Sequence, residues 1–278
     1  MRNKLKGTLQ KLHLYNLAKL FYKFLKFRFF FLEIGKKFYY FFVPTATILI
    51  YHRVADVKND PHLLSVSPDN FYKQLKYLQQ NFQVIKLSEL VENLRTKQLK
   101  NKSVAITFDD GYADNLYNAL PILEKLKIPA TIFAVAGRIN SQTSFYWDEN
   151  TPKQDAGRAL TSKELINLAS SPLVEIGSHT ITHFRLSQLL FKQQKREIAE
   201  SKKIIEKYIK KPVNSFSYPF GEKKDFNKGT AALVKKTGYQ YACANIQGRV
   251  TKKSDLFLLP RKLIRNWDLN QFKSKIKI

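Results

Sequence analysis

Short apolar runs alternate with helical segments along most of this chain, and this alternation is the strongest constraint on its fold. The clearest run, residues 103–108, is followed at once by Asp109, Asp110 and Gly111. Chains that alternate strands with helices build parallel sheets, in which the C-terminal ends of the strands share one edge. The sequence therefore predicts a single parallel α/β domain. Roughly seven strands fit a closed or nearly closed barrel at least as well as an open sheet.

Local signals suggest where the elements begin and end. Ser67 and Pro68 are typical of an N-cap and a first helical position, and Thr161 with Glu164 forms a capping box. Further helices are expected from Ser88, over 115–127 and over 187–209. Strands are expected at 46–51, 82–87, 104–106, 130–135, 173–176, 215–217, 239–242 and 256–259.

Charge and cysteine content narrow the classes of partner and metal site. The 278 residues carry a formal net charge of +26, which favours a polyanionic partner such as an anionic membrane, a phosphorylated glycan carrier or nucleic acid. No nucleic-acid recognition motif is present, and charge alone gives only non-specific, salt-sensitive binding. The single Cys243 excludes a disulfide within the chain and a cysteine-based zinc site. Any metal must therefore be bound by His, Asp or Glu.

Residues 1–43 form a basic, aromatic segment that we expect to be an N-terminal arm, with the α/β domain at 44–278. The segment holds ten Lys or Arg and one acidic residue, Glu33. Lysines fall on one helical face and Leu and Phe on another, which predicts an amphipathic helix at a membrane surface. Charged residues interrupt every window long enough to span a bilayer, and no cleavable signal peptide is recognisable. Packing on the chain's own domain is the alternative.

Several polar residues follow predicted strands and are therefore expected to meet at one edge of the sheet. They are His52, the Asp109–Asp110 pair, His179 and the turn at Tyr218–Pro219. His179 and His183 would face the same side of a helical turn. One carboxylate and two imidazoles make a three-ligand site with open positions, which suits a divalent metal that binds water and polarises a carbonyl. A solvated Asp-Asp turn and surface histidines are the alternative interpretation.

The segments Thr107-Phe108-Asp109-Asp110-Gly111-Tyr112, His179-Thr180-Ile181-Thr182-His183 and Ser217-Tyr218-Pro219-Phe220-Gly221 resemble the successive motifs of the polysaccharide deacetylase family, the NodB-homology carbohydrate esterases. The resemblance covers about residues 45 to 265. It implies a distorted (β/α)7 barrel that removes N-acetyl groups from amino sugars with a divalent metal, usually zinc. It also implies that Asp110, His179 and His183 bind the metal and that Asp109 is the general base.

The remaining roles follow from the same resemblance, with two departures. Tyr218, Pro219 and Phe220 would contact substrate, and the oxyanion would lie on the metal and on the backbone N–H near Phe220. Ser217 stands where the family often has an arginine that orients the base, so Arg261 is expected to replace it, with a structural surface arginine as the alternative. No histidine follows His183, so His52 is the expected general acid, unless His13 or His62 serves. An early histidine resembles the subgroup that acts on poly-β-1,6-N-acetylglucosamine.

These observations predict a metal-dependent hydrolase that deacetylates a polymer such as poly-N-acetylglucosamine, peptidoglycan or a related cell-envelope glycan. We expect a monomer in peripheral contact with an anionic membrane or in the cell envelope, without a specific nucleic-acid partner. The alternative is a non-catalytic glycan- or membrane-binding protein on a deacetylase scaffold. The intact Asp-Asp and His-x-x-x-His motifs favour the enzyme.

Overall fold

The computed structural model describes residues 19, 22, 23, 26, 43–141 and 143–276. The chain divides into two units, residues 1–44 and residues 45–278, and only the second is described in continuous detail. The predicted amphipathic helix of the arm therefore lies outside the described residues, apart from four positions. Among the described residues, no helix combines the length and the apolar character needed to cross a bilayer.

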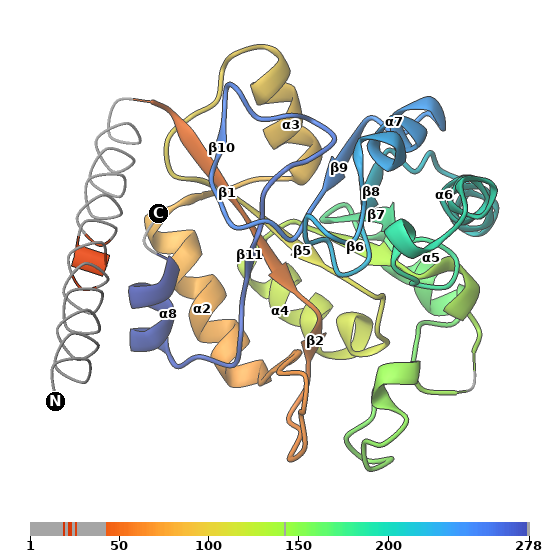
Figure 1. Ribbon diagram of the computed structural model, residues 1–278. Helices are drawn as coiled ribbons and strands as arrows, with labels where there is room; N and C mark the ends of the chain where they lie inside the picture. Colours follow the sequence, from red (N-terminus) through yellow and green to blue (C-terminus); the bar gives the residue numbers. More distant parts are fainter. Residues whose placement is uncertain (1–18, 20–21, 24–25, 27–42, 142, 277–278) are drawn as a thin grey trace, which may run out of the picture. The chain divides into compact units, whose positions relative to one another are not determined.

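A curled, mostly parallel sheet forms the centre of the second unit (Figure 1). Its strands follow the order β10-β1-β5-β6-β7-β8-β9, while β4 pairs with β5 and β11 pairs with β1. Only β10 runs antiparallel to its neighbour β1. The strands are β1 (Thr45–Tyr51), β4 (Gln83–Val84), β5 (Ser103–Phe108), β6 (Ala130–Ala134), β7 (Val174–Ser178), β8 (Ser215–Ser217), β9 (Tyr241–Cys243), β10 (Val250–Thr251) and β11 (Lys262–Leu263).

Helices between the strands cover the outside of this sheet, as a βαβ arrangement requires (Figure 1). The α-helices are α2 (Pro68–Asn81), α3 (Leu87–Arg95), α4 (Leu120–Leu126), α5 (Ser162–Ser170), α6 (Phe191–Ile209), α7 (Lys228–Lys236) and α8 (Leu269–Ile276). A π-helical turn, Asn115–Ala119, leads into α4, and short 3₁₀ turns lie at Ala136–Arg138, Tyr146–Asp148 and Leu186–Gln188. A small separate ribbon joins β2 (Arg53–Val54) to β3 (Ser65–Val66).

Alternation along the strands divides the apolar core into two main clusters. On β1, Leu49 and Tyr51 belong to the large cluster, which includes the buried faces of all these α-helices except α3. Ala46 and Ile48 belong to a second cluster, together with Phe133 from β6 and residues of β5, β9 and α3. Both faces of β1 are buried, which explains why its sequence is a continuous apolar run.

The segment after β9 closes the sheet into a barrel, because it bonds first to β9 and then to β1. The Leu259 N–H donates to Ala242 O at 2.9 Å, and Leu259 forms a parallel bridge with Cys243 in β9. Three residues later the chain pairs with β1 instead, and the Ile264 N–H donates to Ile50 O at 2.9 Å. The expected (β/α)7-type barrel is confirmed, and this crossing segment is what closes it.

Several predicted boundaries differ from the structure. The strand expected at 82–87 is reduced to β4, because α3 already begins at Leu87 rather than Ser88. The helix expected over 187–209 begins at Phe191, since 186–188 form a 3₁₀ turn. The strand expected at 256–259 is a turn in which only Leu259 forms a bridge, to Cys243, and the strand of this region is β11, which pairs with β1.

Candidate metal centre and catalytic cavity

The two carboxylates lie directly after β5, where the chain turns sharply. Asp110 and Gly111 both have a φ of 73°, in the left-handed region. A Cβ on Gly111 would lie 3.0 Å from Ala134 Cα, so glycine is needed for both conformation and space. Asp109 and Asp110 are 5% and 3% exposed. Because the backbone turns between them, the two carboxylates meet different partners.

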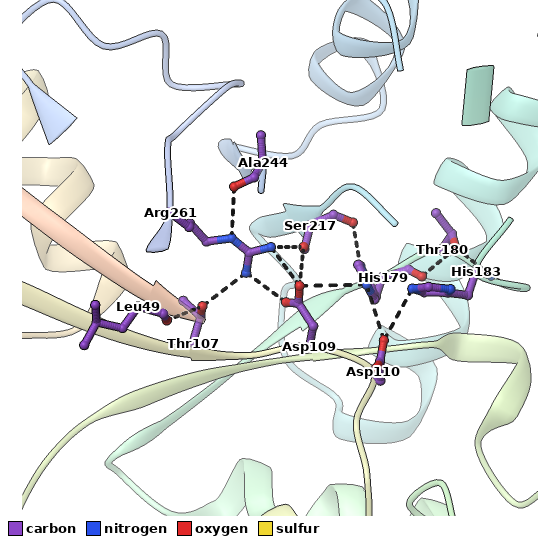
Figure 2. A network of polar contacts seen from close by, with 10 residues as sticks. All are labelled: Leu49, Thr107, Asp109, Asp110, His179, Thr180, His183, Ser217, Ala244 and Arg261. Atoms are coloured by element: carbon purple, nitrogen blue, oxygen red, sulfur yellow. Dashed lines mark hydrogen bonds and ion pairs between the residues drawn. The ribbon is translucent and has the colours of Figure 1, made fainter. Parts of the chain in front are cut away.

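Asp109 is held by a fully buried arginine. Arg261 Nη1 and Nη2 donate to Asp109 Oδ1 and Oδ2, each at 2.8 Å, and Ser217 Oγ donates to Oδ2 at 3.3 Å (Figure 2). Burial alone would raise the pKa of Asp109, but Arg261 outweighs it and holds that pKa far below its usual range. The pair keeps Asp109 ionised.

The remaining donors of Arg261 are also satisfied. Its Nε donates to Ala244 O at 3.3 Å, and Nη1 also donates to Thr107 Oγ1 at 3.1 Å. Nη2 donates to Ser217 Oγ at 2.7 Å. Arg261 is 0% exposed, so the alternative of a surface arginine is wrong. It lies where the crossing segment passes from β9 to β1, and the structure places its guanidinium on Asp109, while its role in orienting a base stays a prediction.

The two motif histidines project from a loop after β7, and this corrects the expectation of a helical turn. Thr180 and His183 have φ values of 68° and 64°, both left-handed. Glu197 on α6 fixes the loop by accepting hydrogen bonds from the backbone N–H groups of Ile181 and Thr182, each at 2.9 Å. The imidazoles still meet, with ring centroids 4.8 Å apart. The loop therefore brings the two imidazoles together, as a helical turn was expected to do.

Asp110, His179 and His183 form the candidate metal centre. One ligand atom from each lies within 4.8 Å of the others. Asp110 Oδ1 is 3.5 Å from His179 Nε2 and 3.4 Å from His183 Nε2 (Figure 2). His179 Nδ1 donates to Ser217 O at 2.7 Å, which leaves the Nε2 lone pair facing Asp110. Two imidazole nitrogens and one carboxylate suit zinc or a similar divalent ion.

The surroundings of Asp110 support a cation at this position. Its Oδ1 is buried and has no hydrogen-bond partner among the described residues. Burial, followed by the negative charge of Asp109, raises the pKa of Asp110 well above its ordinary value. An ionised carboxylate is stable there only beside a positive charge, and the Arg261 fork is already directed at Asp109. The three residues therefore fit a divalent metal.

His52 follows β1 and lines the same cavity. Its Nδ1 is buried and has no hydrogen-bond partner among the described residues. Burial lowers the pKa of His52 to about 4, against an opposing effect of Asp109. The imidazole is therefore neutral near pH 7. His62 also lines the cavity, with its Nε2 3.1 Å from Trp147 O, whereas His13 lies outside the described residues.

The third motif contributes one cavity residue, not three. Tyr218 is 1% exposed, stacks on Phe226 with centroids 4.1 Å apart, and donates from its hydroxyl to Phe257 O. Its side chain is part of the core. Pro219 is likewise buried and lies outside the lining, while Phe220 lines the cavity with a left-handed φ of 60°. Direct substrate contact by the side chains of Tyr218 and Pro219 is not what the structure shows.

The cavity measures about 280 Å³ and collects side chains from loops at the C-terminal ends of the strands. Sequence reasoning missed most of its wall. Trp147 was recognisable only as a large apolar residue in an irregular segment, and its ring lies 4.5 Å from that of His183. Nothing in the local sequence marked Arg185 or Asn245. The wall residues that the motifs did not indicate are Leu64, Tyr146, Trp147, Arg185, Glu222, Lys224, Asn245 and Leu263.

Comparisons with known proteins agree on one family. The family described as Polysaccharide deacetylase matches residues 96–242. YxkH of Bacillus subtilis, which is named as a polysaccharide deacetylase, is 31% identical over 216 residues, covering 77% of this chain and 69% of its own. A poly-β-1,6-N-acetyl-D-glucosamine N-deacetylase of Staphylococcus aureus is 29% identical over 222 residues, covering 73% and 72%.

Solved structures give the same result. A polysaccharide deacetylase from Bacillus cereus superposes with a TM-score of 0.69 at 28% identity, covering 85% of this chain and 70% of that one. IcaB from Ammonifex degensii has a TM-score of 0.68 at 22% identity, covering 82% and 94%, and shows the shared fold. With the family match spanning more than half of the sequence, the chain belongs to the polysaccharide deacetylase family and is a deacetylase.

Proposed function

We propose that this deacetylase is metal-dependent and removes N-acetyl groups from an amino-sugar polymer, with poly-β-1,6-N-acetylglucosamine as the first candidate. One observation carries the proposal: the same cavity holds an arginine-paired carboxylate beside an Asp-His-His set, in which Asp110 Oδ1 has no hydrogen-bond partner among the described residues. The candidate polymer is supported by the relative in Staphylococcus aureus and by the early histidine, His52. Peptidoglycan and related cell-envelope glycans remain the next substrates to test.

In this proposal Asp110, His179 and His183 hold the metal. When bound, a divalent ion lowers the pKa of water and polarises the acetyl carbonyl. Asp109 accepts the proton of the attacking water, and Arg261 keeps Asp109 ionised and oriented for this step. The Phe220 N–H would donate to the oxygen that becomes negatively charged. The amide C–N bond then breaks to give acetate and the free amino sugar.

The leaving amine requires a proton, which we assign to His52. Because this imidazole is neutral near pH 7, it must first accept a proton within the site before it can donate one. His52→Ala should therefore lower kcat by about a hundredfold without loss of metal. A variant with near wild-type kcat would exclude this role, and His62→Ala would then test the other histidine of the cavity.

Activity and metal content test the proposal together. The purified protein, loaded with zinc, should release acetate from β-1,6-linked N-acetylglucosamine oligomers and lose this activity with a chelator. His179→Ala should contain no stoichiometric metal and be inactive. A non-catalytic binding protein would instead bind the oligomers without acetate release. Chitooligosaccharides and peptidoglycan fragments, assayed in parallel, identify the preferred glycan.

The basic arm of residues 1–43 supports a further part of the proposal, peripheral contact with an anionic membrane. Each Lys or Arg near such a surface contributes roughly 1 kcal/mol, and the apolar face of the predicted helix would add to this. The 278-residue chain should co-sediment with vesicles containing anionic lipid at low salt, and a chain beginning near Pro44 should not. Failure of the 278-residue chain to bind would exclude membrane contact by the arm. Gel filtration would test the expected monomer.

A further inference from the structure

Arg185 lies at the edge of the cavity, two residues after the candidate metal ligand His183. Its guanidinium carbon is 3.7 Å from the centroid of the Phe220 ring. The side chain is 32% exposed and lines the cavity. A stacked guanidinium at this distance restrains the ring beneath it. Arg185 therefore connects the loop of the metal ligands to the loop of the third motif.

A buried carboxylate holds the same guanidinium from a second side. Arg185 Nη1 forms an ion pair with Asp225, whose side chain is 1% exposed. Asp225 Oδ2 also accepts the Glu222 N–H at 2.9 Å, and Asp225 O accepts the Ser187 N–H at 2.9 Å. These contacts join residues 185–187 to the turn at 222–225. Stacking on Phe220 is thus part of a fixed arrangement.

Phe220 needs such support because its backbone conformation is unfavourable for a residue with a side chain. Its φ is 60°, and Gly221 follows with a φ of 71°. A non-glycine residue in this region persists when its surroundings restrain it. The Phe220 ring contacts His183, with centroids 5.0 Å apart, in addition to Arg185. Since the ring direction and the peptide orientation are coupled, holding the ring also holds the N–H.

We propose that Arg185 is a positioning residue that fixes the Phe220 peptide for catalysis. The proposal rests on the proposed function, in which the Phe220 N–H donates to the developing oxyanion. Arg185 acts through Phe220 and has its guanidinium occupied by the ring and by Asp225, so it does not serve primarily to bind substrate. Without it the Phe220 peptide would rotate among other conformations and the N–H would be misplaced in the transition state.

Steady-state kinetics of Arg185→Gln test this assignment. A misplaced oxyanion donor should lower kcat roughly 10- to 100-fold with KM changed less than about twofold, because the donor acts mainly in the transition state. Zinc content should equal that of the wild type. Arg185→Lys should not restore kcat, since an ammonium keeps the charge but cannot stack as a plane. Restored kcat in Arg185→Lys, or a rise in KM with unchanged kcat, would overturn the proposal.

Arg158→Gln is the matched control. Arg158 also pairs with a carboxylate, Glu164, and lies 5.9 Å from the Tyr117 ring, but it does not line the cavity. Its removal should leave kcat within about twofold of the wild type. An equal loss of kcat in the control would indicate a general effect of removing any stacked arginine and would overturn the specific role.

A double variant tests whether Arg185 acts through Phe220. Phe220→Leu removes the ring, so adding Arg185→Gln should lower kcat no further. Independent, multiplying losses would overturn the proposal. Hydrogen exchange of residues 218–226 gives a readout without turnover, and it should accelerate in Arg185→Gln but not in Arg158→Gln. Unchanged exchange would overturn it. If the wild type deacetylated no glycan, the proposed function would fail, while exchange would still decide whether Arg185 holds this loop.

Discussion

Asp109 and Asp110 are neighbours in the chain, equally buried, and follow the same strand, yet their environments are opposite. Asp109 receives two guanidinium donors at 2.8 Å, and its pKa is lowered. Asp110 faces two imidazole nitrogens, its Oδ1 has no hydrogen-bond partner among the described residues, and its pKa is raised. The comparison teaches that the environment of each carboxylate is set by the residues that approach it. The protein balances the charge of Asp109 with Arg261, whereas under the proposed function a bound cation would balance that of Asp110.

The largest expected effect is on turnover, and it separates the two aspartates. Under the proposed function, Asp109→Asn and Asp110→Asn should each lower kcat on the order of 10⁴-fold, because the first would lack the base and the second a metal ligand. Only Asp110→Asn should lose stoichiometric zinc. Metal analysis of both purified variants beside the kinetics checks this contrast. Equal metal loss in the two variants would mean that the carboxylates share the ion.

The next largest effect is expected on the free energy of unfolding, and it concerns the charge of Asp109. Arg261→Met leaves Asp109 buried without its partner, which should lower the free energy of unfolding by about 3–5 kcal/mol. Urea denaturation with and without added zinc measures it. Combining Arg261→Met with Asp109→Asn should recover part of the loss, since the buried negative charge is then removed. A stable single variant would show that water or Ser217 suffices to balance Asp109.

Metal removal should lower the stability of the wild type but not that of Asp110→Asn. Free zinc at about 100 times its Kd should stabilise the wild type by about 2.7 kcal/mol, and a chelator should abolish this gain. In the metal-free state Asp110→Asn should be as stable as the wild type or more stable, because it removes an unbalanced buried carboxyl. Thermal unfolding of both proteins in chelator checks the sign. A metal-free Asp110→Asn less stable than the wild type would contradict it.

The smallest effect is expected at Glu164. Like Asp109, its carboxylate is paired with both Nη atoms of an arginine, but this pair is more exposed to solvent. Arg158 donates to both Glu164 oxygens, at 2.6 and 2.7 Å, and this pairing lowers the pKa of Glu164 from 4.5 to about 2. Because the folded pKa is lowered, the stabilisation is present above pH 4.5 and is lost as the pH falls toward 2. Solvent screens this pair, because the Arg158 side chain is 48% exposed.

Glu164→Gln should therefore cost less than about 1 kcal/mol at pH 7, and the difference from wild type should vanish near pH 2. Glutamine keeps the capping box that begins α5, so the substitution isolates the charge. Urea denaturation across this pH range provides the comparison. A loss of unfolding free energy as large as that of Arg261→Met would show that burial does not explain the difference between the two arginine–carboxylate pairs.

Strands with strong apolar runs were predictable from the sequence, and so was the gathering of polar residues at their ends. β1, β5, β6, β7 and β8 lie where the runs were expected, because strands buried on both faces cannot contain many polar side chains. The crossing segment at 259–263 was not predictable, since it depends on two different neighbours. Some helices also begin at other residues than the sequence predicted.

The candidate site was predictable where its residues stand together in short motifs. His179, His183 and Asp110 converge as expected, although a left-handed loop rather than a helical turn brings the imidazoles together. The catalytic and ligand roles of these residues stay predictions. Cavity walls from single loop residues, such as Trp147 and Arg185, carried no periodicity or spacing that could have placed them. The core position of Tyr218 depends on packing with Phe226, which lies eight residues away.

The crossing of the chain from β9 to β1 has a consequence for the order of folding. Arg261 lies on this segment, directly before β11, whereas Asp109 and Asp110 directly follow β5, about 150 residues earlier in the chain. Until residues 259–263 dock, the two carboxylates repel each other without the arginine that balances one of them. The candidate site is therefore complete only when this segment has docked, and a chain that ended before residue 259 would contain the three motifs without Arg261 beside Asp109.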